Sequence, residues 1–221
     1  MTEALHHWID GRAVASCEGG AFDNVDPATG VVISRVARGV PADVAAAVDA
    51  AKRAAKGPWA HMSTGERATV LDAIADAIEA RLEDFARAES RDTGKPLSLA
   101  RRIDIPRAVS NFRFFAGAIR HGEEGFHPMP GAINYTLRKP VGVVGLITPW
   151  NLPLYLLTWK LAPALAMGNT VVAKPSEMTP TTATMLAEVT SEAGLPEGVF
   201  NVVHGYGPET GQPLVEHPDV R

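Results

Sequence analysis

Three short apolar strands that alternate with helices in the carboxyl-terminal part of the chain limit its fold more than any other feature. Val141–Ile147 is an uninterrupted apolar run, and Asn169–Lys174 and Val199–Val203 are two further strand-like segments. Runs of this kind are typical of strands buried on both faces of a parallel sheet. The pattern predicts helices over Leu152–Met167 and over Gly207–Glu216. Between them, a further helix is predicted to begin with Thr179 as its cap and Pro180 at the first helical position. The fold class is therefore α/β, with a doubly wound parallel sheet.

The upstream part is predicted to contain short strands and then helices. Asp10-Gly11 is typical of a hairpin turn, and Asp26-Pro27 of a second turn. Apolar residues at helical spacing predict amphipathic helices over Pro41–Lys56, over Thr64–Glu89, and over Leu97–Arg120 with an early interruption at Pro106.

The chain divides into three predicted parts. Residues 1–131 hold the amino-terminal strands and helices of a cofactor-binding domain, and residues 141–221 its βαβαβα segment. Between them, residues 132–140 form a possible oligomerisation strand. The alternation in Ile133–Arg138 predicts a half-buried strand, interpreted as one arm of a hairpin.

Composition and charge exclude several classes of protein. The net charge is -4 and the basic residues are dispersed, which argues against a nucleic-acid partner. The apolar stretch from Val141 to Trp159 is interrupted by Pro149, Asn151 and Pro153, so no membrane span is expected. Because the start of the chain lacks a signal-peptide pattern, we expect a cytoplasmic protein.

No metal site is expected. The single cysteine, Cys17, excludes an internal disulfide framework and argues against a metal site built on thiolates. His6 and His7 are adjacent, and adjacent residues of a strand point to opposite faces.

Polar residues follow each of the three strands, at the sheet edge where α/β proteins bind ligands. After the first strand, prolines within and just beyond Ile147–Asn151 hold a turn that presents an aromatic ring and a carboxamide. In Lys174–Glu177, an ammonium and a carboxylate three residues apart suit the hydroxyls of a ribose. In His204–Gly207, glycines allow close approach to an adenine or a phosphate. Because G-x-G-x-x-G is absent, this is not the ordinary dinucleotide motif.

Together these segments resemble the aldehyde dehydrogenase superfamily, in the same order and over the whole chain. The stretch Asn134–Pro180 is most similar to the branch that acts on 2-hydroxymuconic and 2-aminomuconic semialdehydes. The matching motifs are Asp26–Gly30, Asp92–Pro96, Arg138–Val144, Pro149–Asn151, Leu161–Ala166, Gly168–Thr170, Lys174–Glu177, Gly194–Pro196, Gly198–Val203 and Gly205–Gly207.

The resemblance implies an oxidoreductase that converts an aldehyde, of the semialdehyde type, to a carboxylic acid with NAD. Asn151 would donate its amide to the oxyanion that forms when a thiolate attacks the aldehyde. Glu177 would favour NAD over NADP, because a carboxylate repels a 2′-phosphate. Arg102 is the candidate for a substrate carboxylate, and Trp159 for a wall of the substrate channel. The implied cofactor-binding residues are Ile147, Thr148, Pro149, Trp150, Lys174, Ser176, Glu177, Gly205 and Gly207.

The resemblance also places the nucleophilic cysteine, the water-activating glutamate and a further glycine loop beyond residue 221. A truncated gene or a fragment is therefore expected, with a homo-oligomer as the complete form. The competing hypothesis is a non-catalytic piece that acts as a partial nucleotide-binding or assembly module.

Each candidate residue also has a simpler interpretation. Asn151 would be only a helix cap, and Lys174 with Glu177 a solvated pair. Arg102 would be a solvated helix residue and Trp159 a core residue. Cys17 as a substitute nucleophile is disfavoured, because nothing in its sequence neighbourhood lowers its pKa.

Overall fold

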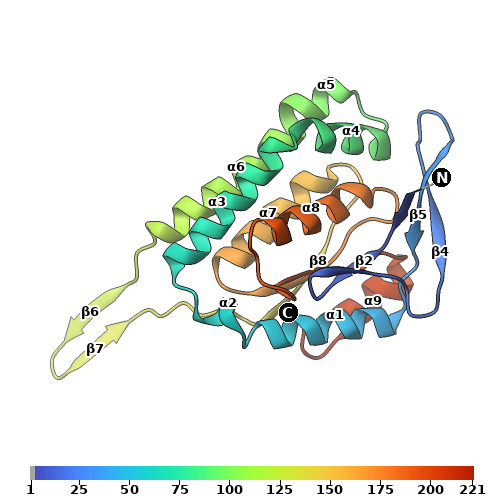
Figure 1. The fold of residues 1–221 in the computed structure, drawn as a ribbon. Coiled ribbons are helices and arrows are strands. Elements are labelled where there is room, and N and C mark those ends of the chain that lie inside the picture. Colours follow the sequence, from blue (N-terminus) through green and yellow to red (C-terminus); the bar gives the residue numbers. More distant parts are fainter. Residues whose placement is uncertain (1–2) are drawn as a thin grey trace.

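A five-stranded sheet lies at the centre of the computed structural model, which describes residues 3–221 (Figure 1). The strand order is β3-β2-β10-β9-β8, and the last three strands are parallel. This confirms the predicted α/β fold. It also adds what the sequence did not predict, because the amino-terminal hairpin joins the same sheet antiparallel to β10. The bounds are β2 (His7–Ile9), β3 (Arg12–Val14), β8 (Val143–Ile147), β9 (Thr170–Lys174) and β10 (Phe200–Val202).

Helices cover both faces of this sheet, as the doubly wound pattern requires (Figure 1). Val171 and Ala173 of β9 pack into the core beneath α7 and α8, whereas Val172 packs on the opposite side against α1. The strand is therefore buried throughout. The bounds are α1 (Pro41–Ala54), α7 (Pro153–Ala166), α8 (Thr181–Glu192), the π-helix η2 (Gly207–Gly211) and α9 (Gln212–Glu216).

A second layer of helices packs outside α7 and α8 (Figure 1). The single helix predicted over Thr64–Glu89 is wrong, because Arg81 leaves helical geometry with φ −107° and ψ 24°. α3 packs chiefly along α6, whereas α4 packs chiefly against η1 and α8. The interruption expected near Pro106 is present as a π-helix. The bounds are α2 (Pro58–His61), α3 (Thr64–Ala80), α4 (Leu82–Thr93), α5 (Leu97–Leu99), η1 (Ala100–Asp104) and α6 (Ile105–Arg120).

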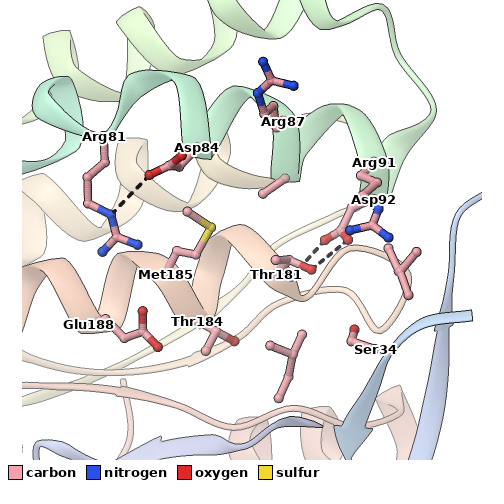
Figure 2. Close-up of a pocket in the computed structure, with 13 residues that line it drawn as sticks. Ser34, Arg81, Asp84, Arg87, Arg91, Asp92, Thr181, Thr184, Met185 and Glu188 are labelled. Atoms are coloured by element: carbon pink, nitrogen blue, oxygen red, sulfur yellow. Dashed lines mark hydrogen bonds and ion pairs between the residues drawn. The ribbon is translucent and has the colours of Figure 1, made fainter. Parts of the chain in front are cut away.

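The start of α8 is capped by a distant residue instead of Thr179. Asp92 of α4 accepts hydrogen bonds from the backbone N–H and the hydroxyl of Thr181, both at 2.8 Å (Figure 2). The Thr179 cap is therefore a wrong prediction, since Pro180 occupies the capping position and no side chain there caps the helix. Burial of the Asp92 carboxyl raises its pKa, although Asn24 and Thr181 favour the charged form.

The predicted turns near the amino terminus are confirmed. Asp10 and Gly11 both have positive φ, as a two-residue hairpin turn requires. The Asp26 carboxylate accepts from the Ala28 N–H at 2.8 Å, and the turn ends at Gly30 with φ +72°. This second turn joins strands of a separate sheet ordered β1-β5-β4, with bounds β1 (Glu3–Leu5), β4 (Ala21–Val25) and β5 (Val32–Ala37).

A hairpin formed by β6 (Phe126–Met129) and β7 (Ala132–Tyr135) projects from the body of the molecule (Figure 1). The predicted hairpin arm is confirmed, but its half-burial is wrong within this chain. Ile133 and Tyr135 are each 64% exposed, because the hairpin packs closely on no other described element. The oligomerisation role of residues 132–140 stays a prediction.

The strand β8 is less buried than expected, because it has a full neighbour on only one side. Val141 precedes the strand and is exposed, and Ile147 is also exposed. On the free side, Val220 forms a parallel bridge with Val143, and Arg221 exchanges backbone hydrogen bonds with Val143 and Gly145.

Candidate cofactor and oxyanion site

The carboxyl ends of β8, β9 and β10 lie side by side, and the loops after them meet at one cavity. The strands are paired in register, with Ile147 opposite Lys174. Trp150, Glu177 and Tyr206, one from each loop, line a cavity of about 380 Å³. The three strand ends that sequence pattern singled out are thus brought together.

Lys174 and Glu177 form a hydrogen-bonded ion pair at the end of β9. The Lys174 side chain is buried, and its Nζ donates to Glu177 Oε2 at 3.0 Å. Burial raises the pKa of Glu177, but its own backbone N–H and the Lys174 ammonium outweigh this, and the pKa lies below its usual value. The carboxylate is therefore charged at neutral pH. The burial of the Lys174 side chain contradicts the interpretation of a fully solvated pair.

The loop after β8 is fastened through its backbone. Thr148 is buried and its N–H donates to the Lys174 carbonyl at 3.3 Å. Lys160 Nζ donates to the Ile147 carbonyl at 2.7 Å. Pro149 follows, and Trp150 is 55% exposed toward the cavity. The chain path is fixed while the aromatic ring stays accessible.

The loop after β10 depends on a buried histidine and on glycine. His204 Nε2 lies 2.9 Å from Thr184 Oγ1, and its backbone N–H donates to His7 Nδ1 at 3.1 Å. Burial, with smaller effects from His7 and Lys174, lowers the pKa of His204 to about 3, so this histidine is neutral. Gly205 has φ +145°, and a Cβ there would lie 2.7 Å from Thr210 Cγ2.

Two further cofactor candidates have different surroundings. A Cβ on Gly207 would meet nothing within 4 Å, so its backbone is open to a ligand. Ser176 is buried, and its Oγ accepts from the Met178 N–H at 3.3 Å, which shapes the turn. Cofactor binding by either residue stays a prediction.

Asn151 is exposed at the start of α7, and its side chain makes no hydrogen bond within the described residues. The cap position belongs to Leu152, where no side chain caps the helix, so the capping interpretation of Asn151 is wrong. Its backbone carbonyl accepts from Lys95 Nζ at 3.3 Å. The side-chain amide of Asn151 is thus free to donate to a ligand, while Lys95 holds the backbone of its loop.

A model of the aldehyde dehydrogenase family matches residues 14–221. The chain belongs to this family. It is 54% identical to a 2-hydroxymuconic semialdehyde dehydrogenase of Pseudomonas sp. (strain CF600), over 98% of this chain and 46% of that protein. It is 51% identical to the human 2-aminomuconic semialdehyde dehydrogenase, over 98% of this chain and 44% of that protein.

Solved structures agree. The NAD⁺ complex of an aldehyde dehydrogenase from Bacillus cereus superposes with a TM-score of 0.96 at 42% identity, over 99% of this chain and 45% of that one. The chain therefore spans less than half the length of these relatives.

On α7, which begins two residues after Asn151, this aldehyde dehydrogenase chain presents an aromatic pair. The rings of Tyr155 and Trp159 lie 5.1 Å apart, and Trp159 is 49% exposed, so its interpretation as a core residue is wrong. Arg107 of α6 donates to the Tyr155 hydroxyl at 2.9 Å. Sequence reasoning missed Arg107 and Tyr155, although Tyr155 precedes Trp159 by four residues, at helical spacing.

Arg102 is not brought into this group. It is exposed on η1, and its Nε donates to the Ser98 carbonyl at 3.4 Å. Its role toward a substrate stays a prediction.

Cys17 lies on the opposite face of the sheet from α7. Its backbone N–H donates to Asp43 at the start of α1. Partial desolvation and the Asp43 carboxylate raise the pKa of the Cys17 thiol, which disfavours the thiolate that a nucleophile requires. Among residues 3–221, no group of three or more His, Cys, Asp or Glu side chains is arranged to hold a metal ion. In the same range, no helix is both long and apolar enough to span a bilayer.

Proposed function

We propose that this chain forms the NAD-binding part of an aldehyde dehydrogenase that oxidises a semialdehyde to a carboxylic acid. The observation that carries the proposal is the Lys174–Glu177 pair, at 3.0 Å, beside the cavity that Trp150 and Tyr206 also line. A charged carboxylate accepts from ribose hydroxyls, and the ammonium has donors beyond the one given to Glu177. These residues fit an adenosine ribose.

The preference for NAD follows from charge. Glu177 stays ionised at neutral pH, because Lys174 and its own backbone N–H lower its pKa. A 2′-phosphate beside that carboxylate meets like-charge repulsion, whereas a 2′-hydroxyl donates to it.

Bound NAD would accept a hydride from the substrate. The residues of this chain bind and orient. Asn151 donates its amide to the aldehyde oxygen as negative charge develops there, which selectively stabilises the transition state. Lys174 and Glu177 hold the ribose at a distance from the reaction.

The substrate class follows from the relatives and from one group of side chains. The relatives named above are semialdehyde dehydrogenases. Arg107 and Trp159 flank Tyr155 of α7, which begins two residues after Asn151, and a guanidinium suits a substrate carboxylate. Arg102 is a second candidate from the sequence. A homo-oligomer joined through residues 132–140, in the cytoplasm, completes the proposal.

The competing function, a non-catalytic binding or assembly module, is favoured by the position and pKa of Cys17. An assay of aldehyde-dependent NADH formation with the 221-residue chain separates the two hypotheses. We expect no turnover by this chain, and turnover by a form extended to the length of its relatives. An inactive extended form that still binds NAD would exclude the dehydrogenase function. Turnover by the 221 residues that disappears in Cys17→Ala would assign the nucleophile to Cys17 instead.

A further inference from the structure

A buried charge cluster lies directly beneath the Asn151 loop. Lys95, between α4 and α5, has a side chain only 11% exposed. Its ammonium donates to Asp104 Oδ2 at 2.6 Å, to Glu89 Oε1 at 3.3 Å and to the Asn151 carbonyl at 3.3 Å. An ammonium has three donors, so all of them are used.

The composition of the cluster is poorly suited to a purely stabilising role. The Glu89 and Asp104 side chains are buried, and a single ammonium faces both carboxylates. Buried charges of this kind contribute little net stability, because desolvation offsets their attraction. Burial, and to a lesser extent Asp104, raises the pKa of Glu89 to about 7, although Lys95 opposes the shift.

Further hydrogen bonds hold the backbone of Lys95, and the cluster acts on residues both before and after Pro153. The Ser90 hydroxyl donates to the Lys95 carbonyl at 2.7 Å, and the Lys95 N–H donates to Thr93 Oγ1 at 3.3 Å. Beyond Pro153, the Leu154 N–H favours the charged form of Glu89. The cluster therefore contacts the loop before α7 and lies near the first turn of α7.

We propose that Lys95, with Glu89 and Asp104, positions Asn151 by anchoring the carbonyl of the residue whose amide binds the oxyanion. Lys95 is a positioning residue, since it contacts the loop backbone and not the reacting atoms. The proposal rests on the proposed function of Asn151 only for its catalytic consequence.

The chain offers a matched control. Glu83 of α4 and Arg101 of η1 form an exposed ion pair at 2.7 Å, which joins the same two elements without touching the loop. If the only role of the cluster were to join α4 to η1, it would duplicate the Glu83–Arg101 pair.

The test measures ¹⁵N relaxation of the backbone amides of Asn151 and Leu152 in the 221-residue chain. Because Lys95→Met alone leaves two buried carboxylates unpaired and risks misfolding, the main variant is Lys95→Met with Glu89→Gln and Asp104→Asn. We expect the order parameters of these amides to fall from about 0.85 to below about 0.6, while those of β9 stay rigid. Glu83→Gln with Arg101→Met should leave the loop unchanged. An equally rigid loop in the triple variant overturns the proposal, as does general loosening that includes β9.

A kinetic readout distinguishes this proposal from the function of Asn151. In a form extended to the length of the relatives, the triple variant should lower kcat by about ten- to hundredfold and leave the KM for NAD unchanged. If Asn151→Ala retains full turnover, the oxyanion role fails, while the relaxation result still decides whether Lys95 holds the loop. A changed KM for NAD with an unchanged kcat contradicts the positioning role.

Discussion

The ends of β8 and β9 are neighbours in one sheet, yet they present their functional groups in opposite ways. At the end of β9, Lys174 and Glu177 bond to each other, and the ammonium is buried. At the end of β8, the Asn151 side chain is exposed, and its loop is held only through backbone groups, by Lys95, Lys160 and the Lys174 carbonyl. The pair proposed to bind the ribose is thus completed by a residue three positions away. The side chain proposed to donate to the oxyanion is left open, and its loop is supported from other elements.

The largest effect is expected from Asn151→Ala, assayed in a form extended to the length of the relatives. Loss of one oxyanion donor lowers kcat by about 100- to 1000-fold. NAD affinity should be unchanged, because the β9 end is intact, and isothermal titration checks this in the same preparation. A loss of NAD affinity as large as the loss of kcat would show that the two strand ends are not separate in function.

The converse variant, Lys174→Met, removes the proposed ribose donor and leaves Glu177 without its partner. We expect the Kd for NAD to rise by about 10- to 100-fold, as for a hydrogen bond to a charged group. Lys56→Met, at an exposed lysine beyond the end of α1, is the matched control for the change of charge. An unchanged Kd in Lys174→Met contradicts ribose binding at this pair.

A smaller effect is expected from Glu89→Gln on the pH dependence of stability. The pKa of Glu89 is about 7 in the folded chain, above its ordinary value of 4.5, so folding favours the protonated form. Its contribution to the free energy of unfolding is therefore present below about pH 4.5 and is lost as the pH rises toward 7, by roughly 1–3 kcal/mol.

Urea unfolding of wild type and Glu89→Gln between pH 5 and pH 8 measures this contribution as a difference, with Glu83→Gln as control. The buried histidines act in the opposite direction, since the lowered pKa of His204 makes stability fall as the pH drops below its ordinary value. Their effect is common to all three proteins. Parallel stability curves for wild type and Glu89→Gln would contradict the raised pKa.

The contrast between the two strand ends also explains what the sequence was able to predict. Buried strands, and a charged pair spaced three residues apart, are local patterns, so β9 and Lys174–Glu177 were found directly. The contacts that support the Asn151 loop, at the end of β8, come from residues distant in the sequence. Lys95 meets Asn151 across 56 positions, and Asp92 caps α8 across 89. No local spacing encodes such contacts.

Other misses have the same origin. The apolar periodicity continues across Arg81, so local spacing alone does not show that α3 ends there. Glu89 falls at helical spacing after Phe85 on the buried face of α4, and this buried charge was the available signal for the cluster. Arg107 was overlooked in favour of Arg102 because only packing shows which arginine meets Tyr155.

The most direct test of the central claim is a calorimetric titration of the 221-residue chain with NAD and with NADP. We expect NAD to bind at least about tenfold more tightly than NADP, because the ionised Glu177 accepts a 2′-hydroxyl and repels a 2′-phosphate. In Glu177→Gln this difference should shrink, chiefly through weaker binding of NAD. Equal affinities in the wild-type chain, or a preference for NADP, would contradict the assignment of the β9 end as the ribose site.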